Sequence, residues 1–189
     1  MGNTVGSLSD MQQQIILGCL LGDGYMRRKT NAHLQITHSV KQKAYVDWKY
    51  QILKNLVLSP PKQYKGNVGR IGYRFFTRSL PELTPFHKLF YKEGLKIVSK
   101  GMVLSPLTLA VWYMDDGSKS GGSCYLNTQH FNNESQNNLI ESLNNIGIKA
   151  TLNKDKHYLR IRLLKESSLL MANIIRPYII ESMFYKLPI

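Results

Sequence analysis

Hydrophobic and polar positions along this chain follow the same succession of patterns twice. In the first half, apolar residues at helical spacing alternate with stretches in which every second residue is apolar. Helical spacing predicts helices, and strict alternation predicts half-buried strands. The first half is therefore expected to contain a helix over 9–22, strands over 25–29 and 32–38, a helix over 41–57, strands over 62–66 and 71–77, and a helix over 81–93.

The second half repeats this order of elements. Ser105 is a preferred N-cap residue and Pro106 suits the first helical position, so a helix is expected to begin there and to end at Asp116. The elements expected after it are strands over 117–120 and 123–129, a helix over 133–146, strands over 148–153 and 157–163, and a helix over 165–175. We predict an α+β fold of two pseudo-symmetric αββαββα subdomains, 1–100 and 101–189.

An apolar run that ends in Asp-Gly stands at corresponding places in the two halves. Ile16 to Gly24 reads ILGCLLGDG and Leu109 to Gly117 reads LAVWYMDDG, and their Asp-Gly steps lie 93 positions apart. Each run is apolar all round, which predicts a buried helix. An ordinary helix stop followed by a turn would explain one such step. Two steps, each between a buried run and a hairpin, favour a shared chemical role.

That role follows from the electrostatics of a helix end. A carboxylate at the end of a buried helix is costly unless it is paired, and the negative end of the helix dipole repels it further. A divalent cation relieves both problems. If the two helices lie side by side, Asp23 and Asp116, with carbonyl oxygens near Gly22 and Asp115, form a site suited to Mg²⁺.

The net charge of the chain indicates which class of molecule it binds. The sequence holds 25 Lys+Arg against 12 Asp+Glu, a net charge of +13, and residues 1–100 carry 16 of the basic and 5 of the acidic residues. Such an excess favours a polyanion, above all nucleic acid. The alternative is a basic globular protein whose charge only keeps it soluble. In a basic protein, a Mg²⁺ site between paired carboxylates indicates phosphodiester hydrolysis.

Cysteine content and hydropathy bear on the compartment. Cys19 and Cys124 are too few for a zinc site or a disulfide framework, which favours a reducing environment. No run approaches the roughly 18 apolar residues of a membrane span, and the start MGNTVGSLSD lacks the basic and apolar regions of a secretory signal. We expect an intracellular protein without a membrane partner, in a mitochondrion, a plastid or a bacterial cytoplasm.

The two Asp-Gly segments resemble the paired LAGLIDADG motifs of homing endonucleases, specifically the single-chain kind encoded in group I introns. The stretch from Ser105 to Gly117 is similar to the second motif of that family, and Arg176-Pro177-Tyr178 and Phe184-Tyr185-Lys186-Leu187-Pro188 resemble its usual ending. The resemblance covers nearly the whole chain. It implies a monomeric, metal-dependent enzyme that makes a double-strand break with short 3′ overhangs at a long, asymmetric DNA site.

The resemblance also implies roles for individual residues. The motif helices would pack at a pseudo-twofold axis, and each half would lay a saddle-shaped antiparallel sheet in the major groove. Asp23 and Asp116, the last acidic residues of the motifs, would bind the catalytic Mg²⁺, with Mn²⁺ or Ca²⁺ as substitutes for binding. Basic residues near each centre would order water or stabilise charge. Lys186 fits this role in the family's ending, and Lys96 is expected to serve the other half, with Lys100 as its rival.

The strands offer a surface for reading DNA. Alternate side chains of a strand that lies in a groove face the bases. His33, Gln35 and Thr37 share one face, and Arg27 has the opposite parity to Arg28. The alternative for any one strand is a solvated polar face. The residues expected to contact DNA are Arg27, Arg28, Lys29, His33, Gln35, Thr37, Lys62, Tyr64, Arg70, Tyr73, Arg74, Lys119, Tyr125, Asn127, Gln129, Lys154, Lys156, Arg160 and Arg162.

Two further functions stay open beside the endonuclease. One is an RNA maturase of the same fold that binds its own intron and assists splicing, and the other is a DNA-binding regulator without catalysis. An HNH nuclease centred on His130 is disfavoured, because no second histidine follows at a suitable spacing.

Overall fold

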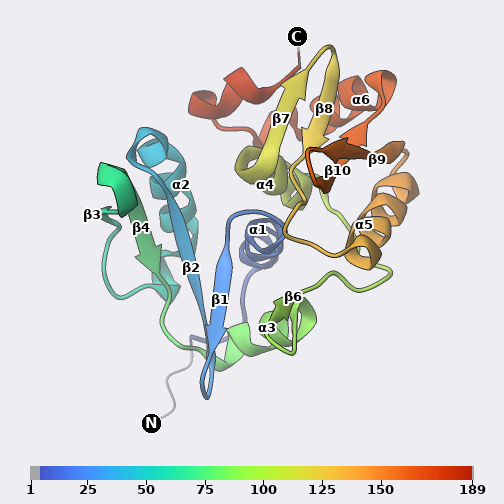
Figure 1. Ribbon diagram of the computed structural model, residues 1–189. Coiled ribbons are helices and arrows are strands. Elements are labelled where there is room, and N and C mark those ends of the chain that lie inside the picture. Colours follow the sequence, from blue (N-terminus) through green and yellow to red (C-terminus); the bar gives the residue numbers. More distant parts are fainter. Residues whose placement is uncertain (1–4, 189) are drawn as a thin grey trace. The chain divides into compact units, whose positions relative to one another are not determined.

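The computed structural model describes residues 5–188, so the first four residues of the N-terminal stretch lie outside it. The chain divides into two compact units, Met1–Lys88 and Leu89–Ile189, drawn in Figure 1 in blue to green and in green to red. The division falls before the repeat boundary expected at residue 100, which remains a prediction. No helix among the described residues is long and apolar enough to cross a membrane.

The first unit contains one four-stranded antiparallel sheet with helices on one side. Its strands lie in the order β1-β2-β4-β3, and α2 packs against β2 and β4 (Figure 1). Its elements are α1 (Asp10–Leu21), β1 (Tyr25–Arg28), β2 (Ala32–Ser39), η1 (Val40–Gln42), α2 (Lys43–Leu53), η2 (Lys54–Leu56), β3 (Lys62–Lys65), η3 (Asn67–Gly69), β4 (Ile71–Phe76) and η4 (Pro81–Leu83), followed by α3 (Thr84–Phe90), which continues into the second unit.

The second unit repeats this topology. Its four-stranded antiparallel sheet has the order β7-β8-β10-β9, with α5 against β9 and β10 and α6 against β8. Its elements are β5 (Tyr91–Lys92), β6 (Leu95–Lys96), α4 (Pro106–Asp116), β7 (Gly117–Ser120), β8 (Ser123–Leu126), α5 (Asn133–Asn145), β9 (Ala150–Asp155), β10 (Tyr158–Leu163), α6 (Lys165–Ile175), η5 (Arg176–Tyr178) and η6 (Glu181–Lys186). The predicted α+β class with a duplicated unit is confirmed.

Local sequence signals account for where the helices begin. Ser9 forms a capping box with Gln12 at the start of α1, and the Ser105 hydroxyl accepts a hydrogen bond from the Thr108 N–H at the start of α4, directly before Pro106. These caps satisfy backbone donors that a first helical turn leaves unpaired.

One predicted helix is shorter than expected. The pattern over 81–93 predicted a single helix, whereas α3 ends at Phe90 and residues 91–96 form the small β5–β6 hairpin. Glu93 and Gly94 both adopt positive φ, at 51° and 79°. That conformation makes a tight turn and cannot continue a right-handed helix.

Each sheet has a covered face and an open face. Along β2, Ala32, Leu34, Ile36 and His38 are buried, while the residues between them are half-buried. In the second unit, Cys124 and Leu126 of β8 and Ile161 and Leu163 of β10 are buried in the same way. The apolar face of each sheet therefore packs on its helices, and the polar alternation predicted for these strands is confirmed.

Candidate functional site: two aspartates at helix ends beside open basic sheets

Asp23 lies in the short turn between α1 and β1. The N–H of Gly22 caps the helix by donating to the carbonyl oxygens of Gly18 and Cys19, and the Gly24 N–H donates to the Cys19 oxygen at 2.7 Å. The Asp23 side chain is 46% exposed. The backbone therefore turns back tightly over the last helical turn and holds this carboxylate at the surface of the first unit.

The glycine that follows each aspartate is required by a close backbone approach. A Cβ on Gly24 would lie 2.6 Å from the Cys19 oxygen, and one on Gly117 would lie 2.3 Å from the Tyr113 oxygen. In both cases the obstacle includes backbone of the preceding helix, which no side-chain rotation relieves. The Asp-Gly step thus permits the chain to leave a buried helix and enter a strand at once.

Replacing Gly117 with alanine is expected to destabilise the protein by about 1–3 kcal/mol, the usual cost of forcing an extra carbon into close-packed surroundings. The obstructing atoms are the Tyr113 oxygen and the Tyr113 ring. Urea unfolding monitored by circular dichroism measures the change. Ser118→Ala, at the next, half-exposed position of β7, is the matched control. An unfolding free energy equal to that of the wild type would contradict the predicted clash.

A buried histidine and lysine lie behind Asp23 in the first unit. His38 Nδ1 is 3.4 Å from Asp23 Oδ2, and Lys49 Nζ is 3.2 Å from His38 Nε2. Lys49 is fully buried, and its ammonium lies 4.1 Å from the centre of the Tyr45 ring. Neither His38 nor Lys49 was among the residues predicted from the sequence.

These contacts favour one tautomer of a neutral His38 ring when Lys49 carries its proton. A lysine ammonium can only donate, so its approach to Nε2 makes that nitrogen an acceptor. The proton of a neutral ring then sits on Nδ1, which faces the Asp23 carboxylate. Histidines of metal sites are commonly oriented through their second nitrogen. Here Lys49 orients the histidine, and the histidine supports the carboxylate.

The spacing of apolar residues along α2 could have indicated from the sequence that Lys49 is buried. Tyr45, Val46 and Leu53 are buried on one side of this helix, and Lys49 is four residues from both Tyr45 and Leu53. Positions four apart lie on the same helical face, so a lysine in this apolar stripe is buried. Burying a lysine completely is costly unless its charge is paired, so a fully buried lysine indicates a specific structural or functional role.

Asp116 is the last residue of α4 in the second unit. Gly117 caps the helix through its N–H to the Tyr113 oxygen, and Asn127 donates from both its backbone and side-chain N–H groups to the Asp116 carbonyl oxygen, at 3.0 and 2.8 Å. The carboxylate therefore projects from a fixed backbone. Its approach to Asp23 remains a prediction.

Lys186 lies at this end of α4. Its ammonium donates to the carbonyl oxygens of Met114 and Asp115, the latter at 3.0 Å. A cation at the C-terminus of a helix is favourable, because it offsets the partial negative charge of the unpaired carbonyls. The Tyr113 hydroxyl donates to the Lys186 carbonyl oxygen at 2.7 Å, which fixes the C-terminal segment against the helix. Its predicted part in catalysis remains a proposal.

The predicted role of Lys96 at the Asp23 centre stays a prediction. Lys96 lies on β6, within the second unit, with its ammonium 5.6 Å from the centre of the Phe131 ring. Burial, and to a smaller degree the charge of Lys96, lowers the pKa of His130 to about 4. Within the first unit, His38 lies beside Asp23, and Lys49 lies behind His38. The rival residue, Lys100, is largely exposed and lies 3.7 Å from the Glu141 carboxylate.

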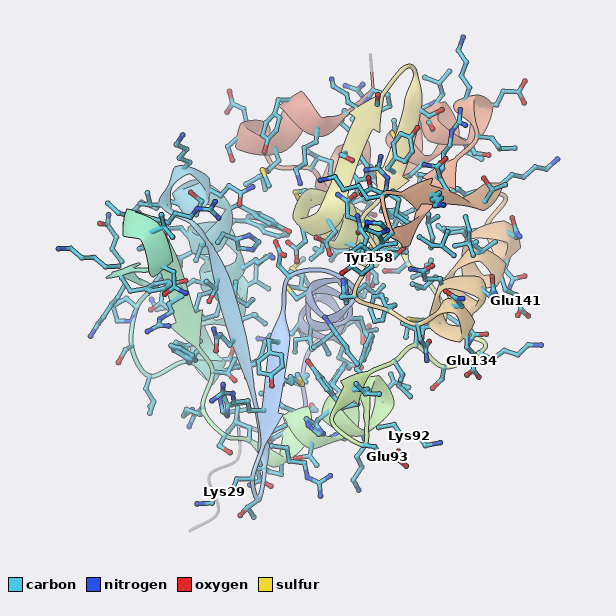
Figure 2. The ribbon with its side chains drawn as sticks, in the orientation of Figure 1. Lys29, Lys92, Glu93, Glu134, Glu141 and Tyr158 are labelled. Atoms are coloured by element: carbon cyan, nitrogen blue, oxygen red, sulfur yellow. The ribbon has the colours of Figure 1, made fainter. Side chains whose placement is uncertain are left out.

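The open face of the first sheet has the polar character that was predicted. Residues paired directly across antiparallel strands share a face. Arg27 pairs with His33, and Thr37 pairs with Arg74, which in turn pairs with Lys62. Lys29 lies beyond the end of β1, at the tip of its hairpin (Figure 2). The side chains on this face are Tyr25, Arg27, His33, Gln35, Thr37, Lys62, Tyr64, Arg74 and Phe76.

A groove joins this face to the carboxylate. It encloses about 1160 Å³ and lies wholly within the first unit, from Asp23 and His38 past Thr37 to Tyr64 and Arg70. A substrate that rests on the sheet can therefore extend to the helix end. A site in which the sheet binds the substrate and the carboxylate takes part in the reaction needs such a continuous groove.

The open face of the second sheet is similar in composition. Arg162 pairs with Tyr125 on one side and Thr151 on the other, and Arg160 pairs with Asn153. Asn127 and Gln129 lie beyond the end of β8 and make internal bonds, since Gln129 donates to the Asp155 carboxylate at 3.0 Å. Thr151 and Asn153 belong to this face although the sequence analysis did not include them.

Four residues predicted to read DNA lie on the helix side of their sheets, so their contact with DNA stays a prediction that the placement on the sheet does not support. Arg28 pairs with Ala32 and Lys154 with Leu159, on the faces opposite Arg27 and Arg160. Tyr73 is 7% exposed, and its hydroxyl donates to Asp47 at 2.9 Å. Lys119 pairs with Cys124 and donates to the Leu187 carbonyl oxygen. In each case the strand pairing decides which face of the sheet the side chain lies on. A shift of one residue in the register would move it to the other face.

Two residues predicted from the hairpins lie in turns. Arg70 follows η3 and is exposed, and Lys156 adopts a φ of 55° between β9 and β10. Side chains at such tips are free to reach a phosphate backbone, and no strand face restricts them.

Comparison with known proteins defines the family. The model of the LAGLIDADG DNA endonuclease family matches residues 13–171. The chain therefore belongs to that family, as its two Asp-Gly helix ends and duplicated sheet predicted.

Individual relatives agree with this membership. The chain is 32% identical to the probable intron-encoded endonuclease 1 of Wickerhamomyces canadensis, over 96% of this chain and 85% of that protein. It is 31% identical to the cytochrome b mRNA maturase bI2 of Saccharomyces cerevisiae, over 99% of this chain and 49% of that protein. The chain thus spans about half the length of the maturase.

Solved structures agree in fold. The homing endonuclease I-WcaI bound to its DNA recognition sequence matches with a TM-score of 0.90 at 28% identity, over 97% of this chain and 88% of that one. I-DmoI in complex with DNA and Mn matches with a TM-score of 0.57 at 14% identity, over 87% of this chain and 96% of that one, a likeness in fold alone. The predicted class, a DNA endonuclease related to intron-encoded enzymes, is confirmed.

Proposed function

We propose that this protein is a site-specific, metal-dependent endonuclease that makes a double-strand break in DNA. The observation that carries the proposal is the duplication. In each unit an aspartate stands between a buried helix and the first strand of a sheet whose open face is polar and basic. A duplex presents two strands to be cut, and two such centres match that requirement.

The donor set suits a hard divalent cation. Asp23 offers an exposed carboxylate beside the Gly22 carbonyl, and Asp116 a half-buried one beside Asp115. Mg²⁺ prefers such oxygens. I-DmoI, described with DNA and Mn, is a member of the same fold that binds a divalent metal. Mg²⁺ is our choice for this chain, with Mn²⁺ or Ca²⁺ as substitutes for binding. The ion, when bound, lowers the pKa of a water and stabilises the leaving oxygen.

The protein's own residues position the reactants. His38 and Lys49 hold the Asp23 carboxylate from the sheet and from α2. Lys186 holds the end of α4, which fixes the direction in which Asp116 projects. The open faces lie in the major groove, where lysines at the strand ends and turns contact phosphates and residues on the inner strands read bases. The target is long and asymmetric, because the two faces differ in sequence.

Incubation with a plasmid that carries the host locus without its intron tests the function. We expect the supercoiled plasmid to become linear with Mg²⁺ and to stay intact with EDTA. The control plasmid carries the locus with the intron in place, which interrupts the target. Absence of a break in the uninterrupted plasmid would overturn the proposal.

A maturase is the second candidate, favoured by the likeness to the bI2 maturase over nearly this whole chain. It would bind the intron RNA that encodes it and assist splicing without cleaving DNA. Splicing of the intron transcript with and without protein, measured beside plasmid cleavage, separates the two functions. Binding to the uninterrupted locus without cleavage would instead indicate a DNA-binding regulator.

A further inference from the structure

Two arginines occupy equivalent positions on the inner strands of the two sheets. In the first unit Ile36 pairs with Phe75, and Arg74 pairs with Thr37 one step along. In the second unit Leu126 pairs with Ile161, and Arg160 precedes Ile161 as Arg74 precedes Phe75. Both lie on β4 and β10, which are flanked by strands on both sides.

Arg74 is clamped between aromatic rings. Its guanidinium carbon lies 4.1 Å from the centre of the Tyr64 ring and 5.2 Å from that of Phe76. Gly72 makes room for this arrangement, because a Cβ there would lie 2.3 Å from the Tyr64 ring. The ring of Tyr64 therefore lies flat on bare backbone, beside the arginine, in a position that no other residue at 72 would allow.

Arg160 is stacked in the corresponding place. Its guanidinium carbon lies 4.3 Å from the centre of the Tyr125 ring, and its Nη1 donates to the Asn127 side-chain oxygen at 3.3 Å. Its buried Nε has no hydrogen-bond partner among the described residues. An aromatic face and one side-chain acceptor thus orient the guanidinium, and the described residues offer its second terminal nitrogen, Nη2, no hydrogen-bond acceptor.

The hydrogen-bonding capacity of Arg74 is largely unused. A guanidinium carries five N–H donors in a planar fork. Residues 5–188 supply Arg74 with ring contacts but with no hydrogen-bond acceptor, although the side chain is half-buried. Stacking fixes the plane of the fork without occupying its edge. Such a group is prepared for a planar acceptor that comes from outside the protein.

We propose that Arg74 and Arg160 each read one guanine, one in each half of the target, through the O6 and N7 atoms in the major groove. The inference rests on the proposed function. Arginine bonded to both acceptors of guanine is the commonest specific contact to a base edge. A position at the middle of an open sheet faces the floor of the groove, whereas lysines at the edges and turns, such as Lys62 and Lys156, face phosphates.

A binding selection tests this assignment. Full-length wild-type protein and its variants select from a pool of randomised duplexes in Ca²⁺, and the recovered duplexes are sequenced. We expect Arg74→Ala to lower the enrichment of guanine at one position by roughly 5- to 150-fold, the usual discrimination of one bidentate pair, and Arg160→Ala to do so at one position in the other half. Arg74→Lys keeps the charge but loses the fork, so it should also lose the guanine preference.

Controls separate base reading from other causes. Arg176→Ala removes an exposed arginine from η5, outside both sheets, and should keep the wild-type preferences. Circular dichroism verifies that each variant is folded. With 7-deazaguanine at the assigned position, which removes the N7 acceptor, wild-type binding should weaken and Arg74→Ala binding should not weaken further.

Two results would overturn the assignment. One is an intact guanine preference in Arg74→Ala and Arg160→Ala. The other is affinity reduced uniformly at all positions with a shallower salt dependence, which is the signature of a phosphate contact. If the wild-type protein enriches no sequence at all, the proposed function itself fails, and that outcome is distinguishable because it precedes any comparison of variants.

Discussion

Replacing either Asp23 or Asp116 with asparagine is expected to abolish double-strand cleavage while leaving duplex binding intact. Asparagine keeps the size and one oxygen of the side chain but removes the negative charge that holds a divalent cation. Metal-assisted stabilisation of the transition state contributes several kcal/mol, so a loss of about a thousandfold or more in the rate of linear product is expected. Gel assays of plasmid cleavage and of duplex binding in Ca²⁺ measure the two properties.

Asp10→Asn is the matched control for these two variants. Asp10 is an exposed aspartate in the first turn of α1, where it contributes only a favourable interaction with the helix dipole. It should cleave as the wild type does. Linear product at the wild-type rate from Asp23→Asn or Asp116→Asn would contradict the assignment of the two carboxylates.

Replacing Lys49 with methionine is expected to raise the Mg²⁺ concentration for half-maximal cleavage by about 10- to 100-fold. This is the usual effect of losing a group that orients the residues of a metal site without contacting the metal. Methionine fills a similar volume but cannot donate to His38 Nε2. The imidazole then loses the contact that keeps its Nδ1 proton toward Asp23. Cleavage rates over a Mg²⁺ series, on protein whose folding is verified by circular dichroism, give the value.

Lys54→Met serves as the control, since Lys54 is exposed in η2, just beyond the end of α2. Its Mg²⁺ dependence should equal that of the wild type. If Lys49→Met is folded and shows the wild-type Mg²⁺ dependence, Lys49 is a structural residue and does not position Asp23.

The two units support their aspartates in different ways. In the first, helix α1 ends at Leu21, two residues before Asp23, and a histidine from β2 lies against the carboxylate. In the second, α4 continues to Asp116, and Lys186 from the C-terminal segment binds the carbonyls at the helix end. The carboxylate therefore has a similar place in both units, while the groups around it differ.

Features that depend on a few neighbouring residues could be predicted from the sequence. Ser9, Ser105 and Pro106 mark the starts of α1 and α4, because capping acts within one turn. The alternation of β2 identified its buried and open faces. The placement of Asp23 and Asp116 at helix–strand junctions could be predicted, because each stands where two clear patterns meet.

Features that depend on register or on tertiary contacts could not be predicted in this way. The opposite faces of Tyr73 and Arg74 follow from the pairing of β4, which fixes strand parity. The proximity of Lys49 to His38 joins α2 to β2 across 11 positions. Lys96 was chosen from the family resemblance as the basic residue for the Asp23 centre, and it lies on the β5–β6 hairpin within the second unit, so that role stays a prediction.

The most direct test of the central claim maps the ends of both strands after wild-type protein has acted on the uninterrupted host locus. With Mg²⁺, we expect one break in each strand, offset to leave a short 3′ overhang, and with EDTA we expect none. A break that persists in EDTA, or a break confined to one strand, would contradict a metal-dependent endonuclease with two cooperating carboxylates.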